Sequence, residues 1–195
     1  MDAGGNLFIA DYGNARVRKV YPDDTITTVA GGGNSRQEGV PAADTQLLSG
    51  LGVAVDSQGN LYLAEEYGGI QKVSPDGTIT TIVGGGNNYI VDAVVILPIA
   101  VAVDFAGDLS IADNLFFTRV RRVSASGILT TIAGNGGNCC FGGDGGPAPS
   151  AQFSCRNHGG CSTGPRTPEG LERCRRANWK HGRYAQESSI RLRVL

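Results

Sequence analysis

The sequence predicts an all-β fold, a partial β-propeller, and three observations predict it. One short pattern occurs three times, at residues 6–11 (Asn-Leu-Phe-Ile-Ala-Asp), 60–65 (Asn-Leu-Tyr-Leu-Ala-Glu) and 108–113 (Asp-Leu-Ser-Ile-Ala-Asp). Each copy is followed by a basic or mixed strand-like run and then by a Thr-Thr-rich strand. The acidic residues that end the copies, Asp11, Glu65 and Asp113, are 54 and 48 residues apart. A unit of about 50 residues that holds four short strands has the size of a propeller blade.

The first copy supplies three predicted strands, at residues 6–11, 16–20 and 26–29. All three are rich in β-branched or aromatic residues, which favour extended backbone. The middle strand mixes Arg and Lys with Val, as expected for an outer, partly solvated strand. This copy begins at the second strand of the unit.

The second copy supplies all four strands, at residues 51–56, 60–64, 70–74 and 78–83. Turn-forming runs such as Ser57-Gln-Gly and Pro75-Asp-Gly separate them. The first two strands are apolar without alternation, which is typical of strands covered on both faces. This pattern favours blades packed around an axis over a two-sheet sandwich.

The third copy repeats the scheme at residues 99–104, 108–112, 118–124 and 128–133. The sequence thus predicts 11 strands, or about 2.75 four-stranded blades, with blades at about residues 1–50, 51–98 and 99–153. So few strands do not easily close a ring, so the end sheets are expected to expose apolar faces and unpaired edges. We therefore expect a truncated or fused piece of a propeller that associates with itself or with a protein partner through these edges.

The strand-end residues Asp11, Glu65 and Asp113 are the repeated acidic positions. Because they precede turns, we expect them to accept backbone N–H bonds, with metal ligation or acid–base work as the alternative. Both histidines lie after residue 153 and no Gly-x-Ser-x-Gly sequence occurs. The sequence therefore offers no convergent catalytic residues and predicts a protein that is not an enzyme.

Two aromatic residues, Phe116 and Phe117, stand in the turn that follows Asp113. Apolar residues are unusual in such a turn. They either pack against the neighbouring blade or form a patch that binds a partner.

Residues 5–20, Gly-Asn-Leu-Phe-Ile-Ala-Asp-Tyr-Gly-Asn-Ala-Arg-Val-Arg-Lys-Val, resemble the signature of NHL repeats of the long bacterial variety. The connector of the third copy, with Gly142-Gly-Asp-Gly-Gly-Pro-Ala-Pro-Ser-Ala-Gln-Phe, is similar to the inter-blade linker of that variety. The resemblance covers about residues 1–153. It implies a β-propeller, usually of six blades, that serves as a binding platform, while a minority of relatives are metal-dependent lyases.

The sequence departs from that family at the turns after the strand-end acids. The family's Asp-x-x-Asn-x-Arg is replaced in the second copy by Glu-Glu-Tyr-Gly-Gly-Ile at residues 65–70, and the third copy inserts residues 115–117. A regular ring of arginines, as in relatives, is therefore expected to be interrupted here.

The composition changes abruptly near residue 153. Residues 1–150 carry 8 Lys and Arg against 15 Asp and Glu, whereas residues 151–195 carry 9 against 3. The first region therefore has a net charge of −7 and the second a net charge of +6, although the net charge of the whole chain is only −1. We therefore expect a second region, a basic tail at 154–195, able to meet phosphates or its acidic neighbour.

The tail contains a Cys-x-x-His-Gly-Gly-x-Ser-Thr-Gly-Pro run from residue 155, which resembles small bacterial and phage-associated proteins. A Thr-Pro-Glu start predicts a helix at 168–181. Arg173, Arg176, Lys180 and, if the turn continues past residue 181, Arg183 are spaced to share one face, with the aromatic Trp179 beside them. Such a stripe is a candidate for salt-dependent nucleic-acid binding, and a solvated or unstructured basic tail is the alternative.

The spacing of Cys155, His158 and Cys161 is that of metal ligands. A fourth ligand from Cys139, Cys140 or Cys174 would complete a tetrahedral zinc site, and unpaired thiols in a loose segment are the alternative. An odd count of five cysteines argues against a disulfide framework.

The sequence thus predicts a non-catalytic binding or scaffold module, with a nucleic-acid-binding tail, zinc-assisted or not, as the second hypothesis. A metal-dependent lyase-like propeller is the third. No apolar run reaches membrane-spanning length. The resemblance implies an extracytoplasmic location, although the sequence holds no signal peptide.

Overall fold

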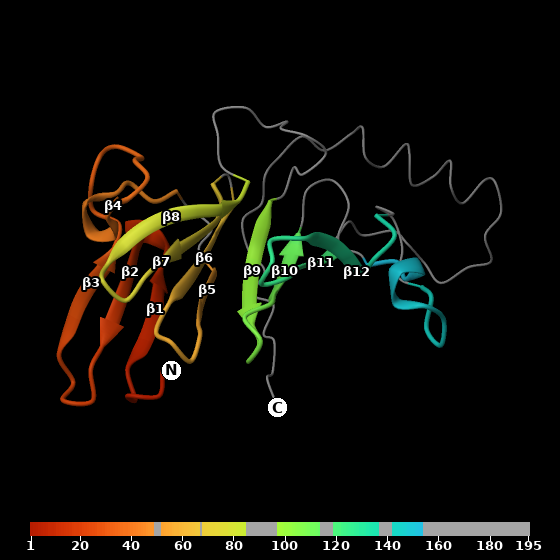
Figure 1. The fold of residues 1–195 in the computed structure, drawn as a ribbon, viewed down its shortest axis with the longest axis horizontal. Coiled ribbons are helices and arrows are strands. Elements are labelled where there is room, and N and C mark those ends of the chain that lie inside the picture. The colour runs from red at the N-terminus through yellow and green to blue at the C-terminus, as the bar shows by residue number, and fades with distance from the viewer. Residues whose placement is uncertain (49–51, 67, 85–96, 114–118, 137–141, 154–195) are drawn as a thin grey trace. The chain divides into compact units, whose positions relative to one another are not determined.

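The computed structural model describes residues 1–48, 52–66, 68–84, 97–113, 119–136 and 142–153. The chain divides into two compact units, Met1–Cys155 and Arg156–Leu195, and the described residues all belong to the first. Throughout this described part the regular structure is β-strand, with short 3-10 turns between strands (Figure 1). The predicted all-β class is confirmed. The predicted helix at 168–181 lies outside the described residues.

The strands form antiparallel sheets in which neighbours in sequence are neighbours in space. Blade one holds β1 (Leu7–Asp11), β2 (Arg16–Val20) and β3 (Ile26–Ala30). Blade two holds β5 (Gly52–Val55), β6 (Leu61–Glu65), β7 (Gly69–Val73) and β8 (Thr78–Val83). Blade three holds β9 (Pro98–Val103), β10 (Leu109–Asp113), β11 (Arg119–Val123) and β12 (Leu129–Ala133). Each of the 11 predicted strands is present, with its bounds within one residue of the prediction.

One further strand, β4 (Val40–Pro41), adds to the outer edge of blade two by pairing with β8. It lies in the first linker, residues 31–48, which connects blade one to blade two and also holds the 3-10 turn η2 (Ala42–Asp44). A two-residue strand that ends in proline carries no periodic signal, so the sequence analysis missed it. This strand attaches the linker to the blade that follows it.

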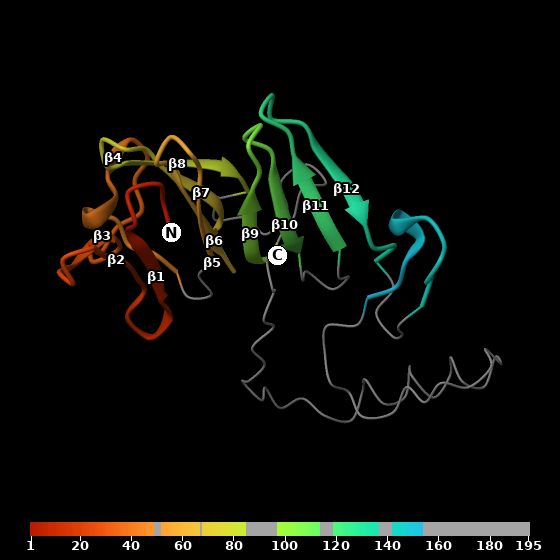
Figure 2. The same cartoon turned by 90° about the horizontal axis from the view of Figure 1, so that it is seen from below.

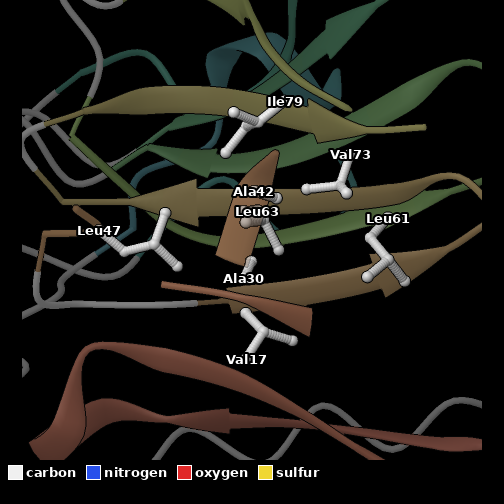
Figure 3. Packing of buried hydrophobic residues seen from close by; sticks show 8 residues of the cluster. All are labelled: Val17, Ala30, Ala42, Leu47, Leu61, Leu63, Val73 and Ile79. Carbon is white, nitrogen blue, oxygen red and sulfur yellow. The ribbon is translucent and has the colours of Figure 1, made fainter. Parts of the chain in front are cut away.

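Blade two is buried on both faces, because every residue of β6 is buried. Its leading face, which we define as the face toward the preceding blade, packs against blade one and the first linker. Figure 3 shows this cluster, which consists of Val17, Ala30, Ala42, Leu47, Leu61, Leu63, Val73 and Ile79. Two neighbours and a linker therefore share one core.

The opposite, trailing face of blade two packs against the leading face of blade three. This second cluster consists of Tyr62, Ala64, Ile70, Val83, Leu109, Ile111 and Val123. The views in Figures 1 and 2 agree that β5 and β6 lie beside β9. Successive sheets thus pack face to face, as blades do.

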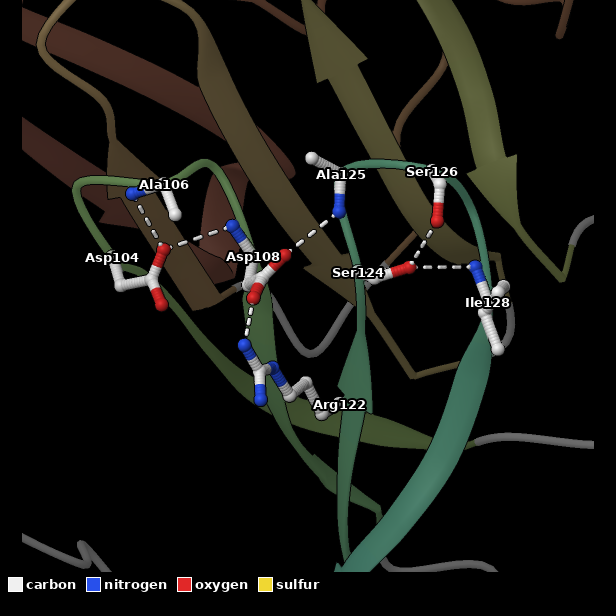
Figure 4. A network of polar contacts seen from close by, with 8 residues as sticks. All are labelled: Asp104, Ala106, Asp108, Arg122, Ser124, Ala125, Ser126 and Ile128. Atoms are coloured by element: carbon white, nitrogen blue, oxygen red, sulfur yellow. Dashed lines mark hydrogen bonds and ion pairs between the residues drawn. The ribbon is translucent and has the colours of Figure 1, made fainter.

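Aspartate side chains hold the turn that precedes the second strand of each blade. In blade three, Asp104 accepts the backbone N–H groups of Ala106 and Asp108, both at 2.9 Å (Figure 4). Asp108 accepts the N–H of Ala125 at 2.8 Å and pairs with Arg122, which lowers the pKa of the Asp108 carboxyl. The first two blades have Asn at the position of Asp108, so its amide bonds the turn aspartate directly, at 2.7 Å in each case.

We expect Leu63→Ala to lower the free energy of unfolding by about 2–5 kcal/mol, because Leu63 is fully buried between two blades and its loss leaves a cavity. Ile82→Ala, at a β8 position that is 41% exposed, is the matched control and should cost under about 1 kcal/mol. Urea unfolding followed by circular dichroism measures both. Equal losses for the two variants would contradict the inter-blade core.

Candidate functional site

The three repeated acids end the second strand of their blades, Asp11 on β1, Glu65 on β6 and Asp113 on β10. In each blade the fourth strand carries a β-bulge, with Val29, Ile82 or Ile132 as its extra residue, beside the third-strand residue that faces the acid. That residue is Arg18 in blade one, Gln71 in blade two and Arg121 in blade three, each paired two residues before the acid in register. The acid and the residue that faces it lie on adjacent strands with unbroken register in every blade, so the fold repeats this juxtaposition.

In blades one and three, an arginine of the same blade faces the acid. Arg18 Nη1 lies 3.7 Å from Asp11 Oδ2, and Arg121 Nη1 lies 3.7 Å from Asp113 Oδ2. Burial differs between the two pairs, because the Asp11 side chain is 25% exposed and that of Asp113 only 4%. The more buried carboxylate also accepts the backbone N–H of Leu97 at 3.0 Å.

Blade two lacks the arginine of its neighbours, and the first linker supplies one instead. Arg36 Nη1 donates to Glu65 Oε2 at 2.6 Å, although the two residues are 29 apart in sequence. In the orientation that satisfies its amide, Gln71 donates to Glu65 Oε1 at 2.9 Å and accepts from Arg36 Nη2 at 2.8 Å. Leu48, also of the linker, donates its backbone N–H to Glu65 Oε2 at 3.4 Å. A buried carboxylate is thereby fully partnered.

Gly68 makes room for this cluster. A Cβ atom added at Gly68 would lie 2.1 Å from Glu65 Oε2 and 2.7 Å from Arg36 Nη2. The Gly-Gly sequence, which departs from the repeat pattern, is thus the steric condition for bringing in the linker arginine. The interruption of the arginine ring expected from the sequence concerns a different position, that of Arg16, whose register equivalent in blade two is Gly69.

Burial and ion pairing act on Glu65 in opposite directions. The side chain has no exposed surface, and desolvation raises the pKa of its carboxyl. The hydrogen bond and charge of Arg36 and the N–H of Leu48 lower the pKa and offset part of this effect. Desolvation is the larger effect, so the pKa lies above the ordinary value of 4.5.

These contacts define what the acids can do chemically. Each described strand-end carboxylate has an arginine partner, and two of them also accept a backbone N–H. Among the residues that the structure describes, no three His, Cys, Asp or Glu side chains gather as ligands of a metal ion would. The arrangement ties blades and linkers together.

The other residues singled out in the sequence lie outside the described residues. They are Phe116, Phe117, Cys155, His158, Cys161, Arg173, Arg176, Trp179, Lys180 and Arg183. Arg36 was not among the functional residues predicted from the sequence. The signal that pointed to it was indirect, namely the Gln at position 71 where the other copies carry Arg.

A cavity of about 370 Å³ opens between blades one and two. Lys19 lines it, with its Nζ 4.4 Å from the centroid of the Tyr21 ring and 5.8 Å from that of Phe8. Asp2 lies in the same wall. Asp2 and Lys19 are the charged residues that line the cavity, and the other lining residues are apolar or small.

The fold and the repeated strand-end contacts define the described part of the chain as a partial β-propeller. No family model and no curated protein matches the sequence. Among solved structures, it is similar to a structural genomics protein of unknown function from Bacteroides thetaiotaomicron, with 18% identity over 76% of this chain and 37% of that one, and a TM-score of 0.58. It is also similar to a gluconolactonase from Xanthomonas campestris, with 20% identity, coverage of 70% and 46%, and a TM-score of 0.50.

These likenesses support the propeller fold. The chain spans less than half the length of either structure. Within the described residues, no helix is long and apolar enough to cross a bilayer.

The first expected outcome concerns the linker arginine. Arg36→Ala should lower the free energy of unfolding by about 3 kcal/mol, because it leaves Glu65 buried without its cation. Adding Gln71→Arg should recover much of this loss, because it restores the arginine that the other blades carry at that position. Urea denaturation of the single and double variants is the measurement. An additive double variant would show that position 71 cannot replace the linker arginine.

A second prediction concerns how the free energy of unfolding depends on pH. Since the folded-state pKa of Glu65 is raised, its contribution to stability is greatest below the unfolded value near 4.5 and is lost as pH rises through the folded value. Wild type should therefore lose stability relative to Glu65→Gln as pH increases over that window. Denaturant unfolding at closely spaced pH values measures the difference, and a wild type that gains stability relative to Glu65→Gln as pH rises would reverse the sign assigned to burial.

Proposed function

We propose that this chain is a non-catalytic binding or scaffold module of the NHL-repeat propeller type, forming part of a larger propeller. The observation that carries the proposal is that the strand-end acids, the residues best suited to chemistry, are engaged by arginines. A carboxylate held by an arginine is a poor metal ligand, which favours surface contact over metal-dependent chemistry as the role of this region. The chain's span of less than half of its structural neighbours supports the idea of a partial propeller.

Binding would use the end of the blades where second strands give way to third strands. Because the strands are antiparallel, the turn at Tyr12–Asn14 and the start of the first linker lie at that same sheet end. Tyr12 is 47% exposed there, and Gln37 and Gln46 are exposed in the linker. An exposed aromatic residue and exposed polar linker side chains are a combination that suits recognition of a peptide or a sugar.

The test is a binding screen of the full chain on peptide and glycan arrays, followed by titration of the strongest hit. Tyr12→Ala should weaken that hit by about tenfold or more. Phe105→Ala, a fully exposed aromatic in the turn at the other sheet end, is the matched control and should leave the affinity within about twofold.

Two results would contradict the proposal. One is equal weakening by both variants. The other is turnover of a lactone that requires stoichiometric metal and is abolished by Asp113→Asn, which would favour an enzymatic role such as that of the Xanthomonas gluconolactonase.

A second candidate function rests on the charge of +6 over residues 151–195. In it, the basic tail binds nucleic acid, with Cys155, His158 and Cys161 as zinc ligands. Replacing Arg173, Arg176 and Lys180 by Gln should then abolish retention on single-stranded DNA at low salt and reduce the salt dependence of binding. Unchanged retention in the triple variant would remove this candidate.

A further inference from the structure

We propose that the leading face of blade one binds the last blade and linker of a second copy of this chain, head to tail. The donor surface consists of the trailing face of blade three and the third linker, which we define as residues 134–136 and 142–153. This self-association goes beyond the proposed binding function. It rests on the way in which blade two is already held within one chain.

Apolar residues of blade one are exposed at positions that are buried in blade two. Leu7, Ile9 and Ile26 are 44%, 39% and 49% exposed. By strand register they correspond to Leu61, Leu63 and Ile79, which are 4%, 0% and 1% exposed. The difference arises because blade one and the first linker cover blade two, whereas no described segment covers this face of blade one. The leading face of blade one, which we call the acceptor surface, thus has the residues of an inter-blade contact but is not covered by any described blade.

The donor blade carries the same side chains that cover blade two. On the trailing face of blade one, Ala10, Val17 and Ala30 occupy successive strands, and Val17 and Ala30 are fully buried against blade two. The corresponding residues of blade three, matched by register, are Ala112, Val120 and Ala133. Residue types are identical at these three positions, so the two trailing faces share this part of their surface, whereas blade three has Ser110 at the register position of Phe8, which packs against the core from blade one.

The third linker has the backbone of the first. Gly31 donates to Ala42 O at 2.9 Å in the first linker, and Gly134 donates to Ala148 O at 3.0 Å in the third. A 3-10 turn follows the proline in both, at Ala42–Asp44 and at Ala148–Ser150 (η3). Ala42 is fully buried, whereas residues 143–150 are all exposed. The third linker therefore has the backbone conformation of the first linker, but its residues 143–150 are not packed against a blade.

The first linker shows how this docking would proceed. Glu38 accepts the backbone N–H of Thr81 at 2.7 Å and also its hydroxyl, and Gly39 donates to Ile79 O at 2.8 Å. Counted from the shared proline, Asp144 and Gly145 occupy the positions of Glu38 and Gly39, and Gly145 has φ +77° against +71° for Gly39. On the acceptor, Thr28 stands at the register position of Thr81. An acid, a left-handed glycine and a threonine thus recur in the required places.

Charge matches the third linker to blade one. The first linker brings Arg36 because blade two has Gln71 at the position that faces its acid. At the corresponding position the third linker has Gly142, so it brings no cation. Blade one needs none, because Arg18 already lies 3.7 Å from Asp11. A linker without arginine therefore suits a blade that has its own.

The number of copies follows from closure. The described residues of one chain offer one donor and one acceptor surface, so the contact is heterologous and ends only when a ring closes. Propellers have about four to eight blades. Two copies with three blades each give six, within this range, whereas three copies exceed it. We therefore infer a dimer with a mass of twice 20.3 kDa.

Sedimentation equilibrium of the full chain tests the proposal, with the dimer as the expected species. Ile9→Glu should raise the dimer dissociation constant by about a hundredfold or more, because it places a charge in the apolar contact. Phe105→Glu is the matched control, since this residue is fully exposed at the other sheet end, and it should leave the dimer intact. Circular dichroism should be unchanged for both variants, because both positions are exposed in the single chain.

A photo-cross-linker in place of Asp144 tests the head-to-tail arrangement. In a mixture of isotopically labelled and unlabelled chains, mass spectrometry should find the cross-link between copies, within β3. A monomeric wild type, a dimer indifferent to Ile9→Glu, or a cross-link between copies that falls on another strand would each overturn the proposal.

Discussion

A sheet with apolar side chains on both faces needs a neighbour on each side, and this constraint governs the described part of the chain. In blade two both faces are covered, and Leu63 and Ile70 have no exposed surface on opposite sides of the same sheet. Burial of each such side chain contributes about 1.5–3 kcal/mol. A single four-stranded sheet would expose the apolar side chains of both faces to water, so its stability comes from packing against neighbouring blades. The first linker matters because it fills part of the interface between blades one and two, where Ala42 and Leu47 complete the core.

Stacking has an electrostatic cost, because it buries the acids at the strand ends. A buried carboxylate is tolerated only with a cation and hydrogen-bond donors. Blades one and three meet this need within the blade, through Arg18 and Arg121. Blade two meets it across 29 residues, with a longer acid at position 65 and a glycine at position 68 that leaves space for the linker guanidinium. The longer acid, the glycine and the linker arginine are thus departures from the repeat pattern that compensate for one another.

The sequence predicted the blades well because their signal is local. Strand positions follow from β-branched runs and Gly-containing turns, and the repeats reinforce one another, so all 11 predicted strands are present. The partners of Glu65 could not be predicted, since a contact across a linker leaves no periodic trace. The replacement of Arg by Gln at position 71 showed that something had changed, without showing which arginine compensates. The interpretations of Phe116, Phe117 and the residues after 153 stay predictions, because these positions lie outside the described residues.

The charges at the strand ends also determine which linker suits which blade. Apolar faces are permissive, because Ala, Val and Leu pack against many similar surfaces. A linker without arginine placed on blade two would leave Glu65 buried without a cation, at a cost of about 3 kcal/mol, or more than a hundredfold in an equilibrium constant. A linker carrying arginine placed on blade one would bring a second cation beside Arg18. Repeats that are nearly interchangeable in their cores are thus distinguished by where one positive charge resides, and this sets the order in which blades can follow one another.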